Sequence, residues 1–194
     1  MSSVVGLLLA AGVGRRMGRP KGLVRDPDGV AWVARSARVL AAGGCSPVVV
    51  VVGASADEVG ALVPDDHLVV TAADWAEGMG ASLRAGLGAL AAGEGADAVA
   101  VAVVVGLVDT PGVTARVVAR LRAAATGPEV LARAAYAGNP GHPVLLGAAH
   151  WAAVAAQASG DAGARAYLAG RPVLLVECGD LGSGEDVDRP PTSA

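Results

Sequence analysis

Four basic residues share one glycine-rich loop near the start of the chain. Gly12 and Gly14 follow an apolar run that ends at Ala10, and Gly18 comes four residues later. Glycine lets the backbone turn tightly and approach a ligand closely, and successive N–H groups can form a concave anion site. Guanidinium and ammonium groups in the same loop would neutralise a polyphosphate. The loop therefore predicts a nucleoside triphosphate site, and its cations are Arg15, Arg16, Arg19 and Lys21.

Two well-known phosphate-binding motifs do not fit this loop. The dinucleotide fingerprint requires G-x-G-x-x-G, and here the third glycine, Gly18, comes one residue too late. The P-loop requires a lysine directly after its last glycine and then a hydroxyl residue. Lys21 instead lies three residues after Gly18 and precedes Gly22. A basic surface loop without a ligand is the alternative interpretation.

A carboxylate follows the most apolar run of the chain. Asp109 comes directly after Val99–Val108, and a carboxylate at the end of a buried strand is costly unless it is solvated, hydrogen-bonded or bound to a metal. Mg²⁺ commonly uses one or two protein carboxylates together with phosphate oxygens. Asp109 is therefore a predicted Mg²⁺ ligand, and the alternative is that it only caps the turn at Pro111.

Two further segments carry candidate polar groups. Ser82 follows Gly78 and Gly80 at the start of a predicted helix, where free N–H groups would face a ligand, or where Ser82 is an ordinary cap. Asp186 and Asp188 alternate near the C-terminus, so both would point to one side of an extended segment. Either is a candidate second metal ligand, and a solvated acidic tail is the alternative.

Short Val- and Leu-rich runs alternate with Ala-rich stretches along the chain. Continuously apolar strands separated by helices predict the α/β class, with a mainly parallel sheet covered on both faces. Ligands in such folds bind at the carboxyl ends of the strands. The predicted strands are 4–10, 48–52, 67–71, 99–108, 130–136, 143–146 and 173–177. The predicted helices are 30–42, 55–62, 82–92, 114–125 (capped by Thr114), 148–158 and 162–169.

Length and composition restrict the function classes. The 194 residues suit one domain, with residues 182–194 as a polar, partly disordered tail. A net charge of −3 lacks the basic field of a nucleic-acid-binding protein. No apolar run approaches the roughly 20 residues of a membrane span, and the N-terminus lacks the basic region of a signal peptide. The sequence therefore predicts a cytoplasmic protein that binds neither nucleic acid nor membrane, with Cys45 and Cys178 unpaired; its oligomeric state cannot be read from the chain.

The glycine-rich loop resembles L-A-A-G-x-x-x-R-M-G-x-x-K, the signature of MobA-like nucleotidyltransferases. Four more segments match that family in the same order. They are Glu77-Gly-Met-Gly-x-Ser-Leu83, Leu107-x-Asp-x-Pro111, Gly138-x-Pro-Gly-His-Pro-Val-Leu145 and Asp186-Val-Asp-Arg-Pro190, the last with Arg189 where the family has threonine. The resemblance implies a three-layer, Rossmann-like fold of the nucleotide-diphospho-sugar transferase type.

The resemblance is closest to molybdenum-cofactor cytidylyltransferases, because alanine at position 11 is typical of relatives that transfer a cytidylyl group. It implies Mg²⁺-dependent transfer of a nucleoside monophosphate from an NTP, with CTP favoured, to the phosphate of molybdopterin, with release of pyrophosphate. The implied catalytic residues are Arg16, Lys21 and Asp109, and the implied metal ligands are Asp109 with Asp186 or Asp188. The implied nucleotide site comprises Leu9, Ala10, Ala11, Gly12, Gly14, Arg16, Lys21, Gly80 and Ser82, and the implied acceptor side comprises Gly141, His142 and Pro143.

Two alternatives stay open at this point. The same chemistry could serve another phosphorylated acceptor, such as a sugar or alcohol phosphate, because the phosphate-handling residues do not separate these acceptors. The chain could also be a nucleotide-binding relative without turnover. The joint presence of Arg16, Lys21 and Asp109 favours catalysis over binding alone.

Overall fold

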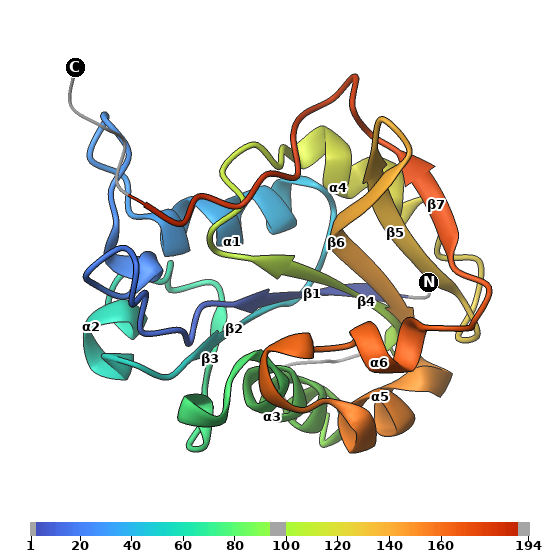
Figure 1. Cartoon of the computed structure of the whole chain (residues 1–194), viewed down its shortest axis with the longest axis horizontal. Coiled ribbons are helices and arrows are strands. Elements are labelled where there is room, and N and C mark those ends of the chain that lie inside the picture. The colour runs from blue at the N-terminus through green and yellow to red at the C-terminus, as the bar shows by residue number, and fades with distance from the viewer. Residues whose placement is uncertain (1–2, 94–99, 190–194) are drawn as a thin grey trace.

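Seven strands form one mixed sheet at the centre of the molecule (Figure 1). The computed structural model describes residues 3–93 and 100–189. Along the sheet the strand order is β3-β2-β1-β4-β6-β5-β7. Strands β3, β2, β1 and β4 are parallel, β6 is antiparallel to both β4 and β5, and β7 is parallel to β5. The strands are β1 (Ser3–Leu9), β2 (Val48–Val52), β3 (Leu68–Thr71), β4 (Ala100–Leu107), β5 (Leu131–Tyr136), β6 (Asn139–Gly147) and β7 (Leu174–Glu177).

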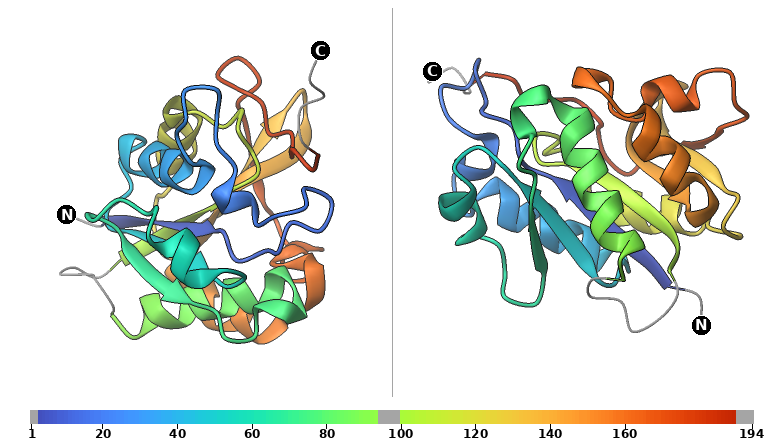
Figure 2. Two further views of the ribbon diagram at one scale, coloured as in Figure 1. Left: turned by 90° about the vertical axis from the view of Figure 1, so that its left-hand side faces the viewer. Right: turned by 90° about the horizontal axis from the view of Figure 1, so that it is seen from below.

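Helices cover both faces of this sheet, as Figure 2 shows from two further directions. One face packs against α1 (Trp32–Ala42) and α4 (Ala115–Arg122), and the other packs against α3 (Met79–Ala91), α5 (Trp151–Gln157) and α6 (Arg165–Leu168). A short helix, α2 (Ala56–Gly60), follows β2. Four short 3-10 helices complete the elements of the described residues: η1 (Lys21–Leu23), η2 (Trp75–Glu77), η3 (Ala148–His150) and η4 (Gly160–Ala162).

The central strands are apolar on both sides because both sides are buried. All five valines of β2 are buried, and in β1 Leu7 pairs with Val49 of β2 and with Val105 of β4. Side chains alternate between two cores, so Leu8 packs on the α1 side and Leu7 on the α3 side. This pattern confirms the predicted fold class, a three-layer α/β fold with a mostly parallel sheet.

All predicted strands and helices occur, with shifts at their ends. Thr114 caps α4 as predicted, since the N–H of Val117 donates to its Oγ1 at 3.3 Å. The strand predicted at 143–146 is longer and begins at Asn139, because Asn139 and Pro140 pair with Tyr136 and Ala135 of β5 in a tight hairpin. The two helices predicted at 148–158 and 162–169 shorten to α5, which continues directly from η3, and α6, which follows η4 after a two-residue turn. Val99, the predicted start of β4, lies outside the described residues.

The C-terminal segment crosses the carboxyl ends of the strands and does not project from the molecule (Figure 1). In this segment the N–H of Ser183 donates to the carbonyl of Gly112 at 3.0 Å, and the N–H of Val187 donates to the carbonyl of Asp109 at 2.8 Å. Within the predicted tail of residues 182–194, defined contacts thus extend to Asp188, and residues 190–194 lie outside the described part.

Two further properties of the fold concern membranes and thiols. Within residues 3–93 and 100–189, no helix combines the length and the apolar character that crossing a membrane requires. Cys45 and Cys178 are both buried free thiols. Burial raises the pKa of the Cys45 thiol to about 12, so this side chain is an uncharged part of the core.

Candidate active site

A cavity of about 510 Å³ opens at the carboxyl ends of β1 and β4. The chain leaves β1 for β2 on one side, and β4 lies on the other, so this is the topological switch point where α/β sheets bind ligands. One wall is the glycine-rich loop after β1, and the other is the segment that leads into α3. The lining residues are Leu9, Ala11, Gly12, Val13, Gly14, Arg15, Arg16, Lys21, Trp75, Ala76, Glu77, Gly78, Met79, Ser82, Leu107, Val108, Asp109, Asp161 and Asp188.

Three distant parts of the chain meet in a charged cluster at the floor of this cavity. Lys21 Nζ, at the start of η1, lies 2.6 Å from Asp109 Oδ2 and 2.6 Å from Asp188 Oδ1. Arg16 Nη2 lies 2.7 Å from the other oxygen of Asp188. The Lys21 side chain is only 14% exposed, whereas that of Arg16 is 68% exposed. Lys21 is therefore part of the floor of the cavity, whereas Arg16 extends over that floor from the glycine-rich loop.

The surroundings shift the pKa values of Lys21, Asp188 and the nearby Asp186. Burial lowers the pKa of Lys21, but hydrogen bonds and charges of Asp109 and Asp188 outweigh burial, so the net pKa is raised. The hydrogen bond from Lys21 lowers the pKa of Asp188. Burial, reinforced by the charge of Asp109, raises the pKa of Asp186. At neutral pH the ammonium of Lys21 is thus held in its charged form.

The carboxylates of this cluster converge on the ammonium of Lys21. Asp109 Oδ2 and Asp188 Oδ1 both lie 2.6 Å from Lys21 Nζ, so a divalent cation held by these carboxylates would bind beside the ammonium. The part of the chain that the structure describes holds no group of three or more His, Cys, Asp or Glu placed for a metal. Two carboxylates plus phosphate oxygens and water is the ligand set that Mg²⁺ prefers.

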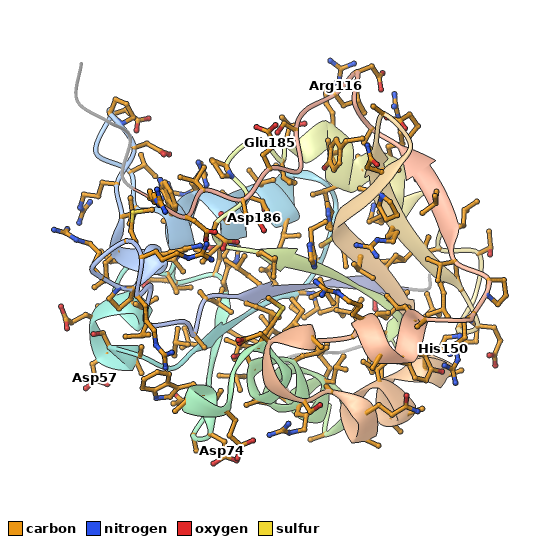
Figure 3. The ribbon with its side chains drawn as sticks, in the orientation of Figure 1. Asp57, Asp74, Arg116, His150, Glu185 and Asp186 are labelled. Carbon is orange, nitrogen blue, oxygen red and sulfur yellow. The ribbon has the colours of Figure 1, made fainter. Side chains whose placement is uncertain are left out.

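The structure separates the two acidic candidates of the C-terminal segment. Figure 3 shows Glu185 and Asp186 on opposite sides of this segment, with Asp186 on the side of the sheet. Asp186 makes no ion pair with Lys21 within the described residues, whereas Asp188 does. The geometry therefore brings Asp188 to Asp109, and a metal-ligand role for either residue stays a prediction.

The glycine-rich loop lines the cavity with residues 12–16, whose N–H groups are not used within the described protein. Among the described residues, no backbone N–H from 12 to 16 donates to a protein acceptor. Gly14 has φ +63°, and a Cβ there would lie 1.9 Å from the carbonyl oxygen of Arg19. Gly12 has open space around its Cα. Gly14 thus folds the loop back on itself, and Gly12 leaves room beside it for a ligand.

The segment before α3 forms the opposite wall. Ser82 is buried and lines the cavity. Gly80 does not line the cavity, because its Cα faces the backbone of Ser159, where a Cβ would lie 2.6 Å from a nitrogen. Ala10 also points away, into the core under α1. The predicted nucleotide-binding residues therefore divide into those that line the cavity and these two, which shape it from behind.

The predicted acceptor-side residues lie beyond the cavity, on β6. The hydroxyl of Tyr136 donates to the carbonyl of His142 at 2.8 Å, and Gly141 packs against the ring of Tyr136. Burial, followed by the charge of Arg133, lowers the pKa of His142 to about 4, so its imidazole is neutral at neutral pH. Pro143 is directed to the α1 side of the sheet and does not line the cavity.

Trp75 and Asp161 are two of the cavity residues that were not among the predicted site residues. Trp75 packs against Gly53, where a Cβ would lie 2.5 Å from that of Trp75, and forms an apolar part of the wall. Asp161 comes from η4, and its carboxylate lies against Gly78 at the other side of the mouth. Trp75 stands next to a matched motif and could have been included with it. Asp161 has no local signal, because only the packing of η4 on α3 brings it there.

The cavity at the switch point of the α/β sheet thus joins a glycine-rich basic loop to a pair of carboxylates. The chain belongs to the MobA-like NTP transferase domain family, whose sequence pattern matches residues 6–175. The predicted family is thereby confirmed.

Relatives and solved structures extend this finding. The chain is 39% identical over 199 residues to "Nicotine blue oxidoreductase" of Paenarthrobacter nicotinovorans, covering 95% of this chain and 92% of that protein. It is similar to the Rv0371c homologue of Mycobacterium sp. strain JC1, with TM-score 0.76, 28% identity and coverage of 96% and 90%. Rv0371c of Mycobacterium tuberculosis H37Rv gives TM-score 0.74 at 27% identity, with coverage of 91% and 88%. The special likeness to molybdenum-cofactor cytidylyltransferases stays a prediction, because the curated relative bears another name.

Proposed function

We propose that this protein transfers a nucleoside monophosphate from an NTP, with CTP favoured, to the phosphate of an acceptor of the molybdopterin type. The observation that carries the proposal is the contact of Lys21 with both Asp109 and Asp188 below a loop of free N–H groups. This arrangement supplies cations and donors for phosphates, and two carboxylates for a divalent ion. Crystals of Rv0371c, a relative at 25% identity, were obtained in complex with manganese, which supports a divalent metal here.

The chain's own residues would act mainly by positioning and by neutralising charge. The N–H groups of residues 12–16 would donate to the triphosphate, and Arg16 would reach its outer phosphates. Lys21 would stabilise the charge that grows on the departing pyrophosphate. Mg²⁺ held by Asp109 and Asp188, when bound, would supply charge neutralisation and orientation of phosphate oxygens. The acceptor phosphate is largely ionised near neutral pH, so its oxygen needs no general base.

The direct test measures pyrophosphate release with Mg²⁺ and each of CTP, GTP, ATP and UTP, with and without a phosphorylated pterin acceptor. We expect release that depends on the acceptor and is fastest with CTP. Release with a sugar phosphate or alcohol phosphate in place of the pterin would retain the enzyme class and replace the acceptor. A nucleotide-induced rise in melting temperature without any release would identify a binding protein that lacks turnover.

Asp109→Asn tests the role of the carboxylate. The substitution keeps the size of the side chain and removes the charge that would hold the metal. We expect pyrophosphate release to fall about 100-fold or more, by analogy with the loss of one strong electrostatic stabiliser. The melting temperature without nucleotide should change little, because Lys21 keeps its contact with Asp188. Near-normal release from the folded variant would contradict the metal role.

A second candidate function rests on the relative at 39% identity, which is named an oxidoreductase acting on nicotine blue. It predicts that the protein reduces nicotine blue when an external electron donor is supplied. The absorbance of the dye follows this reaction directly. Reduction that persists in Asp109→Asn, together with no pyrophosphate release from the unsubstituted protein, would favour this function over nucleotidyl transfer.

A further inference from the structure

The carboxylate of Asp161 enters the cavity from η4, and close backbone contacts fix its position. The segment between α5 and α6 lies against α3 (Figure 1). A Cβ at Gly78 would lie 2.7 Å from the carbonyl carbon of Gly160, and a Cβ at Gly80 would lie 2.6 Å from the backbone nitrogen of Ser159. Glycine at both positions allows this approach. The start of α3 thus supports η4, which holds Asp161 at the wall of the cavity.

An arginine of α3 reinforces this contact between η4 and the helix. Arg84 Nη1 donates to the carbonyl of Ala158 at 2.8 Å, just before η4. Its Nη2 donates to Glu77 Oε2 at 2.6 Å, just before α3. The guanidinium therefore joins the helix to the segments that precede α3 and η4. It also occupies the carboxylate of Glu77, which is another lining residue of the cavity.

Asp161 differs from the other three carboxylates of the cavity because it has no partner within residues 3–93 and 100–189. There it accepts no side-chain or backbone hydrogen bond and forms no ion pair, and its side chain is exposed. The other three each form an ion pair at 2.6 Å, and they are Glu77, Asp109 and Asp188. The oxygens of Asp161 are therefore available to accept hydrogen bonds from a ligand in the cavity.

A carboxylate without a cation does not suit the phosphates of a nucleotide, because like charges repel. The cations Arg16 and Lys21 and the N–H groups of residues 12–16 lie on the side of the glycine-rich loop. Asp161 lies on the wall that α3 and η4 form. The nucleoside is the uncharged part of an NTP and carries N–H and O–H donors. Asp161 therefore suits the nucleoside and not the triphosphate.

Ser82 provides a second polar group on the same wall. It is buried and lines the cavity, and its hydroxyl makes no hydrogen bond within the described residues. Ser82 comes about one helical turn after Gly78, against which Asp161 lies. A hydroxyl both donates and accepts, whereas an ionised carboxylate only accepts. Of these two groups, only Asp161 can thus distinguish a donor on the base from an acceptor.

We propose that Asp161 accepts a hydrogen bond from the exocyclic amino group of the base and thereby selects cytosine over uracil. Cytosine carries an amino group where uracil carries a carbonyl oxygen, and a carboxylate accepts from the first and repels the second. Asp and Glu side chains accept from the same amino group of cytosine in protein–DNA complexes. The inference rests on the proposed function, and it names the residue and the chemical group by which the nucleotide of that function is selected.

Isothermal titration of the full chain with CTP, UTP and 2′-deoxy-CTP tests this selection, with Mg²⁺ present and no acceptor. We expect CTP to bind about tenfold more tightly than UTP, as one hydrogen bond to a charged group warrants. In Asp161→Asn the new amide can donate to the carbonyl oxygen of uracil. CTP should therefore bind more weakly and UTP more tightly, so that the ratio of their affinities falls about tenfold. A gain for UTP is a result that a merely structural role of Asp161 does not produce.

Asp74→Asn is the matched control, because it removes the same charge from an exposed residue that does not line the cavity. Figure 3 shows Asp74 at the edge of the molecule, directed away from the sheet. This variant should keep the ratio of CTP to UTP affinity. A ratio that stays unchanged in Asp161→Asn, or that falls equally in Asp74→Asn, would overturn the proposal. A loss in Asp161→Asn that occurs with CTP and UTP but not with 2′-deoxy-CTP would assign the contact to the ribose and also overturn it.

Failure of this proposal is distinguishable from failure of the proposed function, because the titrations need no acceptor and no turnover. Selection of CTP that depends on Asp161, without pyrophosphate release when an acceptor is added, would retain the base contact and reject nucleotidyl transfer. Acceptor-dependent release with an unchanged affinity ratio in Asp161→Asn would retain nucleotidyl transfer and reject the base contact. A protein that binds neither CTP nor UTP would overturn both.

Discussion

Lys21 is the residue on which the candidate site depends most, because it joins β1's loop to β4 and to the C-terminal segment. Its ammonium lies 2.6 Å from both Asp109 and Asp188. Removing one charged side chain from such a cluster leaves the remaining charges poorly compensated. Arg16 shares only Asp188 and is largely exposed. The structure thus ranks the cations of the loop in a way that the sequence alone does not.

Alanine substitution of the four loop cations tests this ranking. Lys21→Ala and Arg16→Ala should each lower the rate of pyrophosphate release more than the affinity for CTP, because charge on the leaving group grows in the transition state. Arg15→Ala and Arg19→Ala are the controls, since neither side chain joins the cluster within the described residues, and they should change the rate only slightly. Initial rates against CTP concentration give both quantities. Equal losses in all four variants would mean that the loop acts as a diffuse basic patch.

At the scale of the element, the glycine-rich loop is shaped by one close backbone approach. Gly14 and Gly18 both have positive φ, at +63° and +75°, but only at Gly14 would a Cβ meet another backbone atom. The two positions therefore share the cost of a left-handed conformation, about 1–2 kcal/mol for a residue with a Cβ. They differ because only at position 14 would a Cβ overlap the backbone and force the loop to open.

Gly14→Ala should disrupt nucleotide binding and Gly18→Ala should not. The added methyl group at position 14 would overlap the carbonyl of Arg19, so the N–H groups of the loop would lose their alignment toward a triphosphate. We expect the nucleotide-induced rise in melting temperature to fall by at least half in Gly14→Ala and to stay near normal in Gly18→Ala. Thermal unfolding with and without Mg²⁺ and CTP measures both. Similar behaviour of the two variants would show that the close approach does not shape the site.

The sequence predicted those strands and helices that a local pattern of residues determines. The valine run of β2 and the apolar run of β4 define buried strands, and Thr114 identifies a helix start. The short helix α6 has four residues, too few for a clear periodic pattern, and it is placed by packing. The β5–β6 hairpin was underestimated, because residues 139–142 contain glycine and proline, which indicate a loop, and only pairing with β5 makes them a strand.

At the scale of the whole molecule, the candidate site could be predicted only as separate motifs. Lys21 and Asp109 lie 88 residues apart, and Asp188 lies 167 residues from Lys21. The rule that parallel strands present ligands at their carboxyl ends brings the first two together. Nothing in the alternation of Asp186 and Asp188 indicates which one faces the cluster. That distinction depends on the path of the C-terminal segment, which Val187 fixes by its hydrogen bond to the carbonyl of Asp109.

The stability of the whole fold should depend on His142 in mildly acidic solution. Burial and the charges of Arg133 on β5 and Arg165 on α6 lower the pKa of His142, and Asp109 beyond β4 opposes them only in part. The folded-state pKa is about 4, against an ordinary value of 6.5. Between these values the unfolded chain binds the proton first, so the free energy of unfolding falls as pH decreases from 6.5 to 4.

His142→Gln removes the titrating imidazole. The free energy of unfolding should therefore depend less on pH between 6.5 and 4. The contribution is at most about 3 kcal/mol, since each tenfold change in proton affinity corresponds to about 1.4 kcal/mol. Denaturant unfolding of both proteins at several pH values without ligand gives the difference in their free energies of unfolding, from which shared carboxylate effects cancel. That difference should be constant above pH 7 and should shift in favour of the variant as pH decreases toward 4. A difference that does not vary with pH would mean that water reaches the His142 imidazole in the folded protein. Burial and the nearby arginines would then not lower its pKa.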